Sequence, residues 1–141
     1  GYGFRTTITD LHTKNKAGKS VVKISPYAQV VQPKLIYDEN SLIVAVSNEG
    51  RMLVFDISNV PKLAKGKGNK IINIPSARLK RGEEWVVDYA IVGQGTSLLV
   101  YSGKRYLSLK YGDLEHYIGE RGRRGHKLPR GFQRVDYLKS E

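Results

Sequence analysis

The feature that most constrains the fold of this chain is a glycine-marked turn that occurs three times at similar spacing. The glycines are Gly3, Gly50 and Gly103, which lie 47 and 53 residues apart. The second and third turns each connect two apolar runs, a pattern typical of a β-hairpin. A unit of about 50 residues made mostly of short strands indicates a propeller-like array. We therefore predict an all-β fold of about three units in one domain of 141 residues. The repeats are predicted at residues 1–40, 41–92 and 93–141.

The strands of these units follow from the apolar runs. Hairpin strands are predicted at 42–46, 52–57, 98–101 and 105–109, and further strands at 21–24, 30–31, 35–37, 71–74, 85–92 and 132–138. Residues 4–8 read as the second strand of a hairpin whose first strand is missing upstream, so we expect a fragment of a longer protein. Short capped helical turns are predicted at Asp10-Leu11, Asn59-Val60 and Asp113-Leu114.

The central hairpin is apolar without alternation in both of its strands, at 43–46 and 52–55. Strands of this kind are buried on both faces of their sheet. One small sheet cannot bury both faces alone, so neighbouring units must pack against it. Three units are expected to form an incomplete disc.

Positive charge is concentrated in three segments, at 12–19, 62–70 and 120–130. They hold 12 of the 24 Lys and Arg residues but only one of the 13 acids. Residues 17–24 align without a gap on residues 67–74, and each stretch is a basic glycine-containing loop that runs into apolar residues. Because loops at the same place in each repeat fall on one rim, we predict a single curved basic stripe.

The net charge of +11 predicts a polyanionic partner, with nucleic acid favoured over an acidic membrane surface. No apolar run approaches the roughly 18 to 20 residues that span a bilayer. No export leader opens the chain. The absence of cysteine excludes disulfides and thiolate metal ligands. These features favour a cytoplasmic protein without a membrane partner.

Nothing in the sequence has the pattern of a catalytic or metal site. Residues 17–20 end like a phosphate-binding loop, but Thr13 stands where that pattern needs glycine. The three histidines are scattered, and the adjacent acids Glu83 and Glu84 are interpreted as turn-surface carboxylates. No catalytic residue, metal or cofactor is predicted. Packing roles are predicted for Tyr37, Trp85, Tyr89, Tyr101 and Tyr106, whereas Tyr111 and Tyr117 are candidates for nucleic-acid contact.

Several longer motifs span nearly the whole chain. They are Gly1-Tyr2-Gly3-Phe4, Asn15-Lys16-Ala17-Gly18-Lys19, Lys65-Gly66-Lys67-Gly68-Asn69-Lys70, Gly119-Glu120-Arg121-Gly122-Arg123-Arg124-Gly125 and Arg130-Gly131-Phe132-Gln133-Arg134. In these motifs the chain resembles the C-terminal domain of the A subunit of bacterial DNA topoisomerase IV, and in particular the C-terminal part of that domain. The Lys-Gly-Lys-Gly-Asn-Lys segment is the most specific of them.

The resemblance implies a β-pinwheel, a propeller-like disc of four-stranded blades whose basic rim binds and bends duplex DNA. It implies a parent ATP-dependent type II DNA topoisomerase that uses ATP and magnesium on other domains. The implied partners are the N-terminal cleavage domain, which carries the DNA-cleaving tyrosine, and the B subunit of topoisomerase IV. The implied location is the cytoplasm, associated with the nucleoid. Residues 121–125 do not reproduce the glutamine-containing box of the related gyrase protein, so gyrase-like wrapping is not expected.

We therefore predict a non-catalytic, sequence-tolerant module that binds and bends duplex DNA. The residues predicted to contact phosphates are Lys14, Lys16, Lys19, Lys62, Lys65, Lys67, Lys70, Arg121, Arg123 and Arg124. The lack of aromatic residues inside the basic loops favours a duplex over a single strand. Two alternatives stay open: a protein-interaction propeller that docks an acidic partner, and an RNA-binding module.

Overall fold

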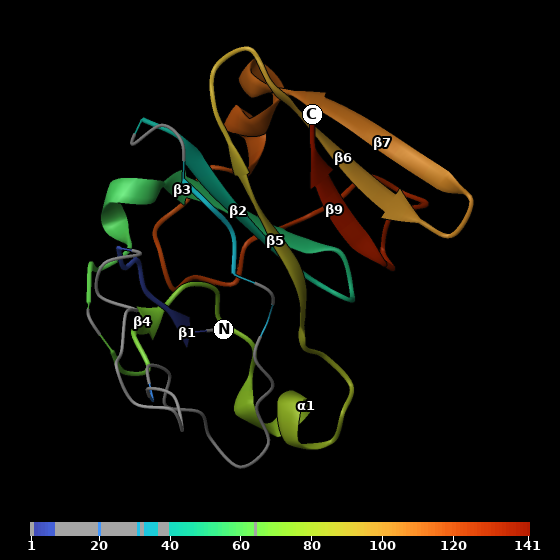
Figure 1. Cartoon of the computed structure of the whole chain (residues 1–141). Coiled ribbons are helices and arrows are strands. Elements are labelled where there is room, and N and C mark those ends of the chain that lie inside the picture. The colour runs from blue at the N-terminus through green and yellow to red at the C-terminus, as the bar shows by residue number, and fades with distance from the viewer. Residues whose placement is uncertain (1, 8–19, 21–30, 32, 37–39, 64) are drawn as a thin grey trace.

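Three β-sheets make up the part of the chain that the computed structural model describes, which is residues 2–7, 20, 31, 33–36, 40–63 and 65–141 (Figure 1). The first sheet pairs β1 (Tyr2–Gly3) with β4 (Asn69–Lys70). The middle sheet has the order β5-β2-β3-β8, formed by Val86–Val92, Leu42–Ser47, Arg51–Asp56 and His126–Lys127. The third sheet has the order β7-β6-β9, formed by Arg105–Lys110, Ser97–Ser102 and Tyr137–Ser140.

The middle sheet is covered on both faces. Leu42, Val44 and Val46 alternate along β2 with Ile43 and Ala45, and all five are buried. The first three belong to a core that includes β6 and β9, whereas the other two belong to a second core on the side of the first sheet. Complete burial of one such side chain contributes about 1.5–3 kcal/mol, so both cores hold this sheet in place.

The hairpins and the double-sided burial predicted from the sequence are confirmed. β2 and β3 pair antiparallel around the turn at Gly50, and β6 and β7 pair around the turn at Gly103. The helical turns are confirmed as the 3-10 helices η2 (Ile57–Asn59) and η3 (Tyr111–Tyr117). The turn at Asp10-Leu11 and the strand at 21–24 lie outside the described residues, and the predicted repeat boundaries stay predictions.

Several predicted strands are wrong. The strand predicted at 71–74 lies earlier, at β4, because β1 offers only two residues to pair with, and Ile71 and Ile72 instead pack into the core. Of 132–138 only the last two residues join β9, since the amide of Val135 donates to the carbonyl of Asn48 in a turn. Residues 31, 35 and 36 are not in strands, while 30 and 37 lie outside the described residues. A short helix that was not predicted, α1 (Ser76–Lys80), precedes β5.

The segment at 4–8 was predicted to be a strand without an upstream partner, and its described part finds partners further along the chain. β1 ends at Gly3, before the predicted start, and pairs with β4 in the register Tyr2 to Lys70 and Gly3 to Asn69. Arg5 forms an isolated parallel bridge with Lys62. The strand predicted at 4–8 is therefore wrong for its described residues 4–7, where Arg5 makes only this single bridge to the basic segment 62–70.

Gly68 makes this close pairing possible. Its φ of +81° lies in the left-handed region, and a Cβ atom at this position would overlap the carbonyl group of Gly3. Gly125 repeats the arrangement in the middle sheet, where an added Cβ would lie 2.7 Å from the carbonyl oxygen of Met52.

We expect Gly68→Ala to lower the free energy of unfolding by more than about 2 kcal/mol, because a left-handed alanine costs roughly 1–2 kcal/mol before any steric overlap. The control is Gly82→Ala, since Gly82 has a φ of +70° but open space around it. Urea denaturation monitored by tryptophan fluorescence measures both losses. Equal losses in the two variants would contradict a role for the contact with Gly3.

Candidate nucleic-acid interface

The basic segment 62–70 is held against the beginning of the described chain. The amide of Leu63 donates to the carbonyl of Arg5 at 2.7 Å, and the amide of Arg5 donates to the carbonyl of Pro61 at 2.7 Å. The Lys67 ammonium lies 4.1 Å from the centre of the Tyr2 ring, where a cation is attracted by the ring face. Lys62, Lys65, Lys67 and Lys70 are all exposed. The backbone of this segment is therefore anchored while its charges face solvent.

The segment 120–127 is anchored in the same way on the middle sheet. Its strand β8 pairs with β3 in the register Arg51 to Lys127 and Met52 to His126. Just before the segment, the amide of Gly119 donates to the carbonyl of Val54 at 3.0 Å. Lys127 thus occupies beside β3 the position that Lys70 occupies beside β1. Both basic segments are therefore held by the same arrangement, a two-residue strand paired antiparallel with a strand earlier in the chain.

The two described basic segments lie directly side by side. The amide of Gly122 donates to the carbonyl of Ile71 at 2.8 Å, and the amide of Asn73 donates to the carbonyl of Arg123 at 2.8 Å. The Arg121 guanidinium donates to the carbonyl of Lys70 at 2.8 Å. We call this surface the basic edge. Its members are Lys62, Lys65, Lys67, Lys70, Arg121, Arg123 and Lys127.

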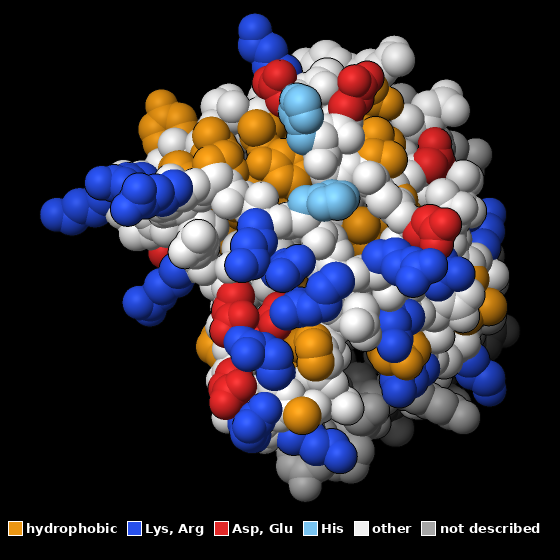
Figure 2. Space-filling view, turned by 180° about the vertical axis from the view of Figure 1, so that it is seen from behind, with side chains coloured by type: hydrophobic (Ala, Val, Ile, Leu, Met, Phe, Trp, Pro, Cys, Tyr) orange, Lys and Arg blue, Asp and Glu red, His pale blue; other side chains and the backbone are white. Residues whose placement is uncertain are grey.

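Figure 2 shows Lys and Arg side chains gathered in a band across the face seen from behind. The structure therefore brings together two of the three predicted segments. The third predicted segment, with Lys14, Lys16 and Lys19, lies outside the described residues. Within the basic edge, Arg123 pairs with Glu120 at 3.1 Å, and both side chains are largely exposed. Such a surface pair contributes little energy and leaves the arginine free to exchange partners.

Arg124 differs from the other predicted contacts because its guanidinium is held by a buried carboxylate. It donates two hydrogen bonds to Glu84, at 2.5 and 2.6 Å, in the paired geometry that arginine makes with a carboxylate. Glu84 is 0% exposed. The interpretation of Glu84 as a turn-surface carboxylate is therefore wrong, whereas Glu83 is exposed as predicted.

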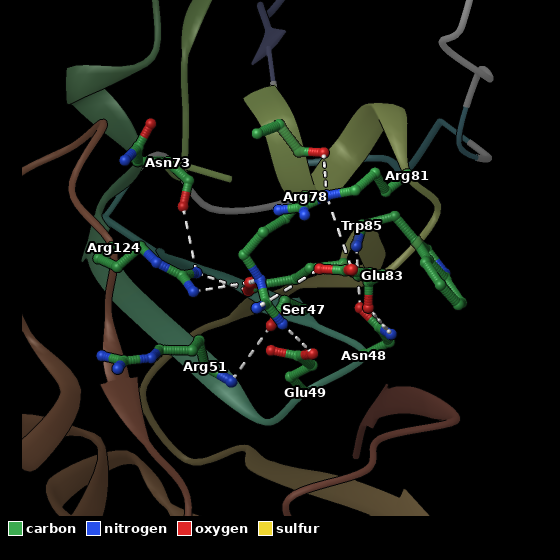
Figure 3. Close-up of polar contacts among 12 residues, drawn as sticks. Ser47, Asn48, Glu49, Arg51, Asn73, Arg78, Arg81, Glu83, Trp85 and Arg124 are labelled. Carbon is green, nitrogen blue, oxygen red and sulfur yellow. Dashed lines mark hydrogen bonds and ion pairs between the residues drawn. The ribbon is translucent and has the colours of Figure 1, made fainter. Parts of the chain in front are cut away.

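Glu84 also contacts Arg78 and Ser47, which are labelled in Figure 3 together with Arg124. Arg78 of α1 donates to it at 3.2 Å and also pairs with Glu49 and Glu83. Burial by itself raises the pKa of Glu84, but hydrogen bonds from Arg124, Ser47 and Arg78 and the charge of Arg124 outweigh it, so the pKa lies below its ordinary value of 4.5. The carboxylate is therefore ionised at neutral pH.

Sequence reasoning missed two groups of this region. Lys127 was counted within a basic segment but was not predicted to contact phosphate. Its place on the basic edge follows only from the register of β8 against β3 in the structure. No local pattern marks Glu84, since 40 residues separate it from Arg124. Among the described residues, no group of three potential metal ligands was found.

The aromatic predictions are corrected at several positions. Trp85 is 46% exposed and belongs to neither core, whereas Tyr106 is 63% exposed but lies beside Tyr101, with the ring centres 6.0 Å apart. Trp85 borders an open hollow of about 590 Å³ between the β2–β3 turn and residues 133–136. Tyr117 is buried and Tyr111 packs against the same core, which excludes both from the exposed basic edge.

Comparison with known proteins identifies the class. A family model described as the DNA gyrase C-terminal domain, a β-propeller, matches residues 1–36 and 41–92. The chain belongs to this family of DNA gyrase C-terminal domains, and its all-β, propeller-like fold is confirmed.

Its relatives are more specific. The chain is 53% identical over 139 residues to the A subunit of DNA topoisomerase 4 from Pseudomonas aeruginosa and 44% identical over 136 residues to that from Escherichia coli K12. These matches cover 98% and 96% of the chain but 18% of each relative, so the chain spans under a fifth of their length. The solved E. coli ParC C-terminal domain is similar over 100% of the chain and 57% of its own, with a TM-score of 0.88 and 43% identity. The resemblance to the A subunit of topoisomerase IV is thereby confirmed.

The lowered pKa of Glu84 predicts how stability responds to acid. A carboxyl group whose folded pKa lies below its unfolded value stabilises the fold above that value, and this contribution is lost as the pH falls through the folded pKa. We expect Glu84→Gln to lower the free energy of unfolding at pH 7 by about 2–4 kcal/mol, near the lower end for buried pairs because both arginines are partly exposed.

Urea denaturation from pH 7 to pH 3 measures the difference in the free energy of unfolding between wild type and Glu84→Gln. It should narrow below about pH 4.5, where the wild-type carboxylate begins to lose its ionic contribution. A difference that stays constant to pH 3 would contradict the assignment of an ionised Glu84.

Proposed function

We propose that this chain is a non-catalytic module that binds duplex DNA through the basic edge. The observation that carries the proposal is the direct contact between the segments 62–70 and 120–127, which places their lysines and arginines on one surface. Neutralising several phosphates together releases condensed counterions, and this release supplies most of the affinity of sequence-independent binding. Contacts of this kind position DNA without reading its sequence.

The proposed contacts differ in their supporting evidence. Lys62, Lys65, Lys67, Lys70, Arg121 and Arg123 belong to the described basic edge, and the equivalence with Lys70 adds Lys127 to them. Lys14, Lys16 and Lys19 extend the proposal by their place in the sequence repeat. Contact of Arg124 with DNA stays a prediction, and its pairing with Glu84 favours a supporting role.

The names of the relatives suggest a larger enzyme around this module. We propose that the parent protein is the A subunit of a type II DNA topoisomerase, in which this module holds and bends a DNA segment for strand passage. It would act with the N-terminal cleavage domain and with the B subunit of the same enzyme. ATP and magnesium would be used by other domains, in the cytoplasm at the nucleoid. Among the described residues, no helix is long and apolar enough to cross a membrane.

Docking of an acidic protein and binding of RNA would use the same charges. The three partners are separated by competition at matched charge and salt, with labelled duplex DNA displaced by a single strand, by RNA or by an acidic protein. Stronger displacement by RNA or by the acidic protein than by unlabelled duplex would favour that alternative.

The affinity for a duplex of 20 to 30 base pairs should depend steeply on salt. If about 6 to 8 phosphates are neutralised, the affinity falls by roughly three orders of magnitude or more between 50 and 200 mM salt. A gel-shift or anisotropy series with linear and supercoiled DNA measures the slope. A flat response would contradict binding by counterion release.

Reversing charges on the basic edge should nearly abolish binding while the fold survives. We expect the triple change Lys65→Glu, Lys67→Glu and Lys70→Glu to weaken binding at least about a hundredfold, because three favourable phosphate contacts become repulsive. The control carries the same charge change at Lys104, Lys110 and Lys139, which are exposed residues on or beside the third sheet. Equal weakening in both triple variants would show that net charge, and not the basic edge, carries the binding.

A further inference from the structure

Glu84 is the only charged side chain that is fully buried within the described residues. A buried carboxylate is unfavourable unless it is paired and hydrogen-bonded, and replacing such a pair by apolar groups often does not reduce stability. Stability alone therefore does not explain a carboxylate at this position. Its partners, in contrast, come from three separate parts of the chain: Ser47 at the end of β2, Arg78 in α1, and Arg124 in the segment 120–127.

The pair with Arg124 lies at the junction of the two basic segments. Arg124 also donates to the carbonyl of Asn73 at 3.5 Å, and the amide of Asn73 donates to the carbonyl of Arg123. Arg51, at the start of β3, donates to the carbonyl of Gly125 at 3.3 Å on the other side of the pair. The segment 120–127 is thus fastened at its middle by Glu84 and at its end by β8.

We propose that Glu84 is a positioning residue for DNA binding, which fixes Arg124 and thereby holds the segment 120–127 against residues 70–73. This inference rests on the proposed function, since it states that DNA binding by the basic edge requires the acidic residue Glu84. Arg124 acts as the anchor of the segment, and Arg121, Arg123 and Lys127 meet the phosphates. In Figure 3, Arg124 points toward the residues around α1 and the β2–β3 turn, in agreement with this role.

The proposal predicts that Glu84→Gln weakens DNA binding, which is opposite to the change expected from the net charge alone. Glu84→Gln raises the formal net charge of +11 by one unit, so long-range electrostatics alone would leave binding unchanged or tighten it. A displaced segment 120–127 instead leaves one or two phosphates without a cation. We expect about tenfold weaker binding and a salt slope smaller by about 0.9 for each phosphate that is no longer neutralised.

The matched control is Glu83→Gln, which makes the same charge change one residue away on a side chain that is 43% exposed. Both variants of the 141-residue chain are compared with wild type on a duplex of 20 to 30 base pairs over a salt series. Unchanged or tighter binding by Glu83→Gln, together with weaker binding and a smaller slope for Glu84→Gln, supports the proposal. Equal behaviour of the two variants overturns it.

A second pair of variants keeps the test decisive if Glu84→Gln does not fold. Arg124→Lys preserves the charge but loses the paired hydrogen bonds, and lysine serves a phosphate as well as arginine does where only charge is needed. We expect Arg124→Lys to bind about three- to tenfold more weakly, and the control Arg81→Lys, on an exposed side chain, to bind like wild type. Wild-type affinity of Arg124→Lys overturns the positioning role.

Hydrogen exchange separates positioning from direct contact. The amides of Gly122 and Asn73 donate the hydrogen bonds that join the two segments, so they should exchange faster in Arg124→Lys without DNA. Weaker binding with unchanged exchange at both amides would assign Arg124 a direct phosphate contact and overturn the proposal. If wild type itself binds duplex DNA without salt dependence, the proposed function fails first, and that result is distinct from a failure of the Glu84 variants alone.

Discussion

The short antiparallel pairing between a basic segment and a strand earlier in the chain is the interaction on which the rest of the structure depends. β4 pairs with β1, and β8 pairs with β3, in matching registers. A ladder of two residues contributes little to the free energy of folding. Each of the two ladders nevertheless fixes the position of a polar, glycine-containing segment. The hydrogen bonds between Leu63 and Arg5, between the two basic segments and between Arg124 and Glu84 then build on the course that these ladders set.

A surface of this kind has to hold like charges close together. The backbone hydrogen bonds between residues 70–73 and 121–123 bring the segments into contact despite their common charge. The buried pair of Glu84 and Arg124 offsets part of that repulsion at the point where the segments meet. A low local dielectric strengthens this pairing, and the same burial makes an unpaired Glu84 costly. The acidic residue and the basic edge therefore belong to one electrostatic arrangement.

Features encoded locally could be predicted from the sequence, and features set by distant partners could not. The glycine turns and unbroken apolar runs of β2 and β3 are local signals, and the hairpin and its double-sided burial follow from them. The extent of a strand depends on the neighbouring edge, so the strand expected at 71–74 became the two-residue β4. The segment 132–136 is not a strand, and the amide of Val135 donates to the carbonyl of Asn48 in the β2–β3 turn. The contact of Glu84 with Arg124 crosses 40 residues, a separation at which no periodicity or spacing rule applies.

The exchange of strands between neighbouring sheets also determines how the molecule responds to mechanical load. The segment 62–70 follows η2, which comes directly after β3 of the middle sheet, yet β4 is hydrogen-bonded to β1 in the first sheet. A pull on this segment is therefore shared between a covalent connection on one side and a β-ladder on the other. The segment before β8 is tethered in the same manner. Tension on either segment is therefore transmitted to two sheets at once.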